Sequence, residues 1–95
     1  MKAHDALQAA LATLELRGKQ NGYDDKGERS AADIANLFNW HTDKSLSEED
    51  AWRFMICLKE VRLKRQRENG GDITDTLIDL ISYTALLAEC ITEKS

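Results

Sequence analysis

Three side chains that could do chemistry recur at helical spacing near the C-terminal end of the chain. Asp75, Asp79 and Tyr83 stand four residues apart within "GGDITDTLIDLISYTALLAE", residues 70–89. Residues four apart lie on one side of an α-helix, so the two carboxylates and the phenol share a face. Such a pair of carboxylates can ligate Mg²⁺, pair with buried cations, or form a solvated face. The three alternatives stay open from these residues alone.

The preceding segment, 48–68, carries polar side chains between two apolar stripes. One stripe consists of Ala51, Phe54, Leu58 and Val61, and the other of Trp52, Ile56 and Leu63. Lys59, Arg62 and Gln66 run between them. An antiparallel hairpin about "NGG", residues 69–71, would place Arg62 opposite Asp79 and Lys59 opposite Tyr83. Because an isolated buried charge is very costly, we expect Lys59 and Arg62 to pair with the aspartates.

Four helices are expected to position these residues. Apolar residues recur at helical spacing over about 3–17, 30–40, 47–68 and 74–92, and proline is absent. Gly18 is a plausible end for the first helix, and Ser47 with Asp50 three residues on forms a capping box for the third. No alternating strand pattern occurs. The prediction is an all-α, four-helix bundle-like domain over residues 1–95, with helices three and four as an antiparallel hairpin.

The apolar positions of these helices predict both a core and a partner. The residues expected in the core are Leu11, Leu14, Ile34, Leu37, Phe54, Leu58, Val61, Leu77, Leu80, Ile81 and Leu87. The second half of the last helix is apolar nearly all round, and Trp52 and Ile56 add a second stripe on the third. This is more apolar surface than one small bundle can bury, so we expect a homodimer or a larger oligomer.

Composition and charge exclude several classes of protein. The net charge of −4 does not favour a nucleic-acid binder, and the basic residues of "KEVRLKRQR", 59–67, do not form one stripe. No segment is long and apolar enough for a signal peptide or a membrane span, so a cytoplasmic location is the default expectation. We expect Cys57 and Cys90 to be buried free thiols. The polar loop 22–29 could carry function or simply link two helices.

Two motifs give the chain a family resemblance. "DAWRFMICLKEVRL", residues 50–63, and "DTLIDLISY", residues 75–83, resemble a small helical family of unknown function encoded by bacteriophages and prophages. Arg17, Tyr23 and "IANLF", residues 34–38, are similar to further elements of that family, although Asp24 stands where glycine is usual and Phe38 where tryptophan is. The resemblance covers residues 17–89. It implies a phage origin and a cytoplasmic protein, which would be the host cytoplasm, but no known activity.

A wider likeness is to the MazG-like all-α nucleoside triphosphate pyrophosphatases. Their Glu-Glu-x-x-Glu and Glu-x-x-Asp motifs hold magnesium, which bridges phosphates and orients the attacking water. Here Asp75 and Asp79 are one residue further apart than the second motif requires, and Arg53 stands where the first motif has its last glutamate. Half of that metal site is therefore missing or altered.

Two functional hypotheses follow. The first is a phage accessory protein without a cofactor, which binds a phage or host protein. The second is a magnesium-dependent pyrophosphohydrolase with a divergent site. Its metal ligands would be Asp75 and Asp79 with Asp50 or Glu49, its phosphate ligands Lys59 and Arg62, with Tyr83 in the same cluster. Carboxylates converging on an open cleft favour the enzyme, and carboxylates closed onto cations favour a structural pair.

Overall fold

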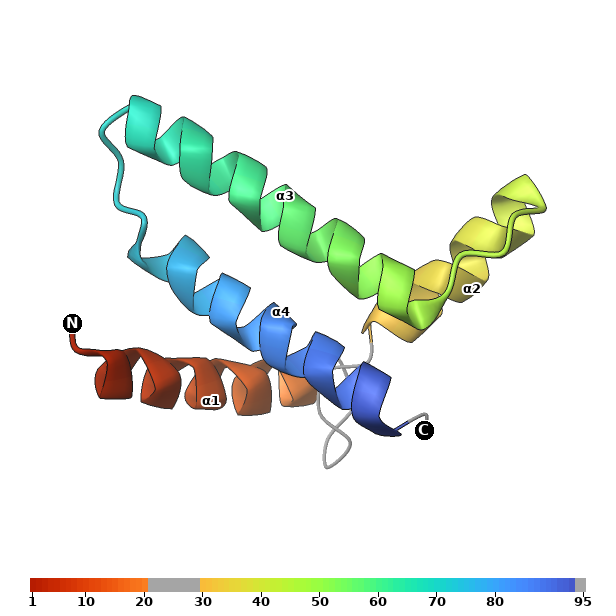
Figure 1. Ribbon diagram of the computed structural model, residues 1–95, viewed down its shortest axis with the longest axis horizontal. Helices are drawn as coiled ribbons and strands as arrows, with labels where there is room; N and C mark the ends of the chain where they lie inside the picture. The colour runs from red at the N-terminus through yellow and green to blue at the C-terminus, as the bar shows by residue number, and fades with distance from the viewer. Residues whose placement is uncertain (21–29, 94–95) are drawn as a thin grey trace.

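The chain folds into four helices in the computed structural model, which describes residues 1–20 and 30–93 (Figure 1). They are α1 (Ala3–Gln20), α2 (Ser30–Thr42), α3 (Glu48–Glu68) and α4 (Thr74–Glu93). The all-α class predicted from the sequence is confirmed. The predicted loop over 22–29, and Tyr23 with it, lies outside the described residues.

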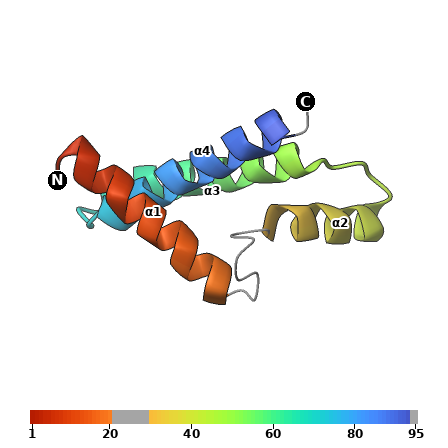
Figure 2. The ribbon, with the colours of Figure 1, turned by 90° about the horizontal axis from the view of Figure 1, so that it is seen from below.

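Helix α4 lies between two others and connects the structure. It runs antiparallel to α3, as the hairpin prediction required, and packs against α1 on another side (Figures 1 and 2). Helix α2 packs against α3 and extends beyond its N-terminal end. Because α1 and α3 both contact α4, side chains on the inner side of α4 can reach residues of two other helices.

Local signals fix the ends of α3. The Ser47 hydroxyl accepts a hydrogen bond from the Asp50 backbone N–H at 3.0 Å, and the Ser47 backbone N–H donates to the Asp50 carboxylate at 3.4 Å. This is the capping box that the sequence predicted. Gly70 turns the chain after α3 with a φ of 72°, a left-handed conformation that costs glycine little. The first helix is longer than predicted, since α1 continues past Gly18 to Gln20.

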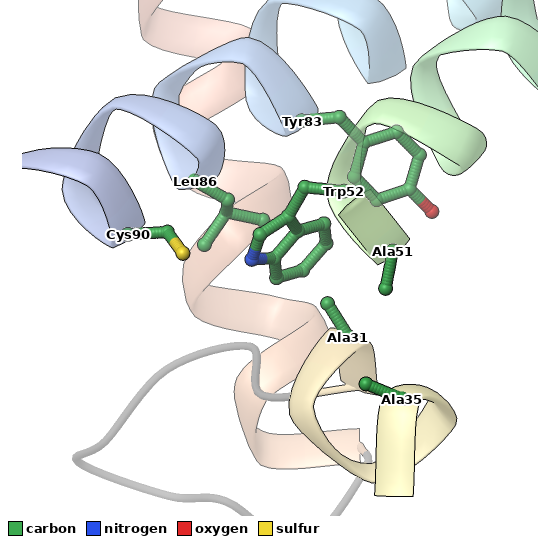
Figure 3. Packing of buried hydrophobic residues seen from close by; sticks show 7 residues of the cluster. All are labelled: Ala31, Ala35, Ala51, Trp52, Tyr83, Leu86 and Cys90. Carbon is green, nitrogen blue, oxygen red and sulfur yellow. The ribbon is translucent and has the colours of Figure 1, made fainter. Parts of the chain in front are cut away.

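The core forms where α2, α3 and α4 meet. Seven buried residues make up the cluster: Ala31, Ala35, Ala51, Trp52, Tyr83, Leu86 and Cys90. Figure 3 shows the Trp52 ring between Leu86 and Tyr83, with the three alanines at its other edge. Small side chains let α2 approach α3 closely, and the single large indole fills the space that remains.

The predicted core list was wrong for the described structure. Leu14 and Leu87 pack partly buried against the cluster, but none of the eleven residues is fully buried. Leu11, Phe54 and Val61 are 59%, 68% and 53% exposed. The reason is that α3 and α4 turn inward the stripes containing Trp52 and Asp79, so the stripes with the most aliphatic residues face outward. Among the cysteines, Cys90 is buried as expected, whereas Cys57 is exposed.

No helix among the described residues is long and apolar enough to cross a membrane.

Candidate functional site

Asp79 occupies the inner face of α4, where a charge needs partners. The residue is 8% exposed, and Tyr83 follows one turn later at 9%. Thr76, Ser82, Leu86 and Cys90 are the other buried residues of this helix. The inner face of α4 is therefore largely polar in its first half and apolar in its second half.

Two cations from two other helices meet the Asp79 carboxylate. Nη2 of Arg17, near the end of α1, lies 2.7 Å from Oδ1. Nζ of Lys59, in the middle of α3, lies 2.9 Å from Oδ2. The Lys59 side chain is only 12% exposed, and the Arg17 side chain 31%. Each carboxylate oxygen thus has its own cation, which satisfies the buried charge and ties α1 and α3 to α4.

Tyr83 links the ion pairs to the apolar core. Its hydroxyl lies 3.4 Å from Nη1 of Arg17, which donates a hydrogen bond to it. The charged groups of Arg17 and Lys59 both stand 5.9 Å from the centre of its ring, within reach of a cation–π interaction. On its other side the ring contacts Trp52, with ring centres 5.7 Å apart. The phenol therefore faces the cations while its ring extends the core.

Neutral hydrogen bonds flank this cluster. The Thr76 hydroxyl donates to Oε1 of Gln66 at 2.7 Å, one turn before Asp79 and between the same two helices. On the α1 side, the Ser82 hydroxyl lies 3.1 Å from the carbonyl of Ile78 and 3.4 Å from that of Ala10. These contacts pair the polar groups along the inner face of α4 with neighbouring helices.

The arrangement neutralises the buried carboxylate of Asp79 with two cations. Each oxygen of Asp79 is engaged by one cation at a short distance, and the residue is 8% exposed. We define the Asp79 cluster as Asp79, Arg17, Lys59 and Tyr83. It contains two positive charges and one negative charge, and its geometry suits the mutual anchoring of three helices.

The other predicted site residues lie elsewhere. Asp75 and Arg62 are exposed, and the cation that joins Lys59 at Asp79 is Arg17 rather than Arg62. The predicted pairing of Arg62 with Asp79 is therefore replaced by one with α1. Asp50 begins α3, at the opposite end of the hairpin from Asp75, and its carboxylate serves the capping box (Figure 1).

The carboxylates predicted to ligate magnesium lie apart from one another. Asp50, Asp75 and Asp79 do not converge, and within residues 1–20 and 30–93 no three or more His, Cys, Asp and Glu side chains form a group that could hold a metal ion.

Sequence reasoning missed the place of Arg17. Its position at the end of an apolar helical pattern was the signal that the sequence offered. A pairing rule within the α3–α4 hairpin could not include α1, because contacts between distant helices depend on the packing of the whole chain.

Comparisons with known proteins give one family match. A family model described as "Domain of unknown function (DUF6378)" matches residues 5–91. No similar curated protein and no similar solved structure was found.

Proposed function

The chain belongs to the DUF6378 family, whose function is unknown. From its own residues, we propose that it acts by binding another macromolecule rather than by catalysis. The observation that carries this proposal is the closure of Asp79 onto Arg17 and Lys59 at 2.7 and 2.9 Å. A pyrophosphohydrolase needs that carboxylate free to hold a metal ion.

The exposed surface supports a binding role. Large apolar side chains are more than half exposed on three helices: Leu7, Leu11, Leu16, Leu37, Trp40, Phe54 and Val61. Single exposed apolar residues are ordinary, but several on each helix are typical of surfaces that other molecules cover. The motifs shared with the phage and prophage family support a phage-encoded accessory protein that binds a phage or host protein.

Turnover of nucleotides tests the absence of catalysis. The purified protein is incubated with Mg²⁺ or Mn²⁺ and a panel of ribo- and deoxyribonucleoside triphosphates, and pyrophosphate and monophosphate are measured. Asp79→Asn is the test variant and Asp75→Asn the matched control, because Asp75 is exposed on the same helix. We expect no release by any of the three proteins.

Release by the wild type that disappears in Asp79→Asn would overturn the proposal, whether or not Asp75→Asn retains it, because the enzyme hypothesis makes Asp75 a metal ligand as well. That result would assign Asp79 to a metal ion and make the protein a divergent MazG-like pyrophosphohydrolase.

A further inference from the structure

Helices α1 and α4 together leave one uncharged face uncovered. We define the α1–α4 face by ten residues: Ala3, Leu7, Leu11, Leu77, Leu80, Ile81, Thr84, Leu87, Ala88 and Ile91. None is fully buried, and Leu7, Leu11, Leu77 and Ile91 are 60%, 59%, 41% and 43% exposed. Nine of the ten are apolar and none is charged.

The two helices contribute to one continuous surface. Ala3 of α1 and Leu77, Leu80 and Ile81 of α4 line the same groove, whose volume is about 390 Å³. Leu7 and Leu11 follow Ala3 along α1 at intervals of four residues and are exposed beyond the groove, which Ala6 lines from the same helix. On α4, Thr84, Ala88 and Ile91 continue the face by the same periodicity. Figures 1 and 2 show the two helices crossing in contact.

Helix α4 is inverted relative to an ordinary surface helix. An amphipathic helix normally buries its apolar stripe and leaves its polar side in water. Here the buried side holds Thr76, Asp79 and Ser82 in the first half of the helix and becomes apolar only in the second half, whereas an aliphatic stripe lies on the outer side. Since the Asp79 cluster fixes which side of α4 faces α1 and α3, the aliphatic side is only partly covered: Leu80, Ile81 and Leu87 are half-buried, whereas Leu77 and Ile91 are exposed.

The chain exposes more surface than a compact monomer of its mass. A folded monomer of 10.7 kDa is expected to expose about 5,500 Å². The chain exposes 6817 Å². The excess of roughly 1,300 Å² belongs to the chain as a whole, and the exposed side chains of the α1–α4 face contribute to it. Each partner buries approximately 800 Å² in a standard interface.

We propose that the α1–α4 face is covered by the same face of a second copy of this chain, in a two-fold symmetric dimer. Lys2 lines the groove, but the ten residues of the face carry no charge. An interface poor in charged residues is typical of permanent homodimers, whose interfaces resemble a domain core cut in half. The core within one chain is small, so the apolar face gains most from a partner that covers it permanently. A second copy of the chain is such a partner, because it is present wherever the chain is synthesised. The inference rests on the proposed binding function and names one partner for it.

Sedimentation equilibrium at tens of micromolar protein tests the dimer. Leu11→Glu and Leu77→Glu each place a charge in the proposed interface. Val61→Glu is the matched control, because Val61 is 53% exposed on α3 and does not belong to the face. We expect a wild-type dimer, an unchanged control, and a dissociation constant raised roughly a hundredfold or more in both face variants.

Helical circular dichroism is recorded for each variant. If a glutamate variant loses its helices, Leu7→Ser and Leu11→Ser replace it, since these smaller polar side chains weaken the interface without adding a charge. A folded, monomeric wild type would overturn the proposal and point to a different partner for the face. Dimerisation that survives in the face variants, or that only Val61→Glu abolishes, would overturn the location. Neither result bears on nucleotide turnover, so the two proposals fail separately.

Discussion

Asp79 carries the two ion pairs that join α1 and α3 to α4. It is buried, and Arg17 and Lys59 each engage one of its oxygens. Replacing it with asparagine keeps the size but leaves two cations near each other with no anion between them. We expect Asp79→Asn to lower the free energy of unfolding by about 2–3 kcal/mol, measured by urea denaturation.

Asp75→Asn is the control for this prediction. Asp75 is exposed one turn earlier on the same helix, so its loss should change the free energy of unfolding by less than about 0.5 kcal/mol. Equal stability of the two variants would mean that the ion pairs at Asp79 contribute nothing measurable.

At the residue scale, the sequence predicted that a buried aspartate of α4 pairs with cations, but it identified only one of the two cations correctly. The expectation that an aspartate of α4 pairs with Lys59 is confirmed. Lys59 could be found because its place between two apolar stripes marked it as semi-buried. Arg62 shares that strip of α3 but is exposed, since the packing of α1 brings Arg17 to the carboxylate first.

The hairpin turn between α3 and α4 depends on one glycine. Gly70 has a φ of 72°, and a Cβ added there would meet nothing within 4 Å. The cost of Gly70→Ala is therefore conformational alone, and we expect a loss of about 1 kcal/mol in thermal or urea unfolding. Gly71→Ala is the matched control, since its Cβ would stand at an ordinary 3.5 Å from the Gln66 carbonyl oxygen. A larger loss for Gly71→Ala than for Gly70→Ala would contradict this account of the turn.

The start of α4 gives a pH dependence. The Thr74 backbone N–H, and then the Thr74 hydroxyl, donate to the Asp72 carboxylate and lower the pKa of Asp72 below its ordinary value of 3.8. A carboxyl whose pKa is lowered by folding adds stability above its unfolded pKa, and this stability is lost as the pH falls through the lowered value.

The wild type should therefore be more stable than Asp72→Ala by a constant amount above about pH 5, and the difference should shrink below about pH 4. Urea unfolding of the wild type and of Asp72→Ala at pH values from below about 4 to above about 5 measures this difference in stability. A difference that is the same at both ends of the range would show that the ionised carboxylate does not hold the start of α4.

At the element scale, local signals predicted more than packing did. The capping box at Ser47 and the turn after α3 were readable because neighbouring residues determine them. The buried sides of α3 and α4 could not be predicted in this way, since each helix carries more than one apolar stripe. Hydrophobicity favoured the stripe of Phe54 and Val61, whereas the structure buries that of Trp52.

The whole molecule is open for its size. Its radius of gyration is 14.3 Å, against roughly 12 Å for a compact domain of this length. With α2 at one end and α1 crossing α4, the described helices surround two large buried rings, Trp52 and Tyr83, together with Leu86 and smaller side chains. The sequence indicated this surplus of apolar surface through the apolar girth of α4. It could not say which stripe would remain outside.

The fold is then expected to gain stability from association through the α1–α4 face. Thermal unfolding followed by circular dichroism, over a hundredfold range of protein concentration, tests this most directly. Because a dimer that dissociates on unfolding is favoured by mass action, we expect the midpoint temperature to rise by several degrees with concentration in the wild type and in Val61→Glu. The rise should disappear in Leu77→Glu. A wild-type midpoint that is the same at every concentration would contradict a fold whose apolar face is covered by a second copy.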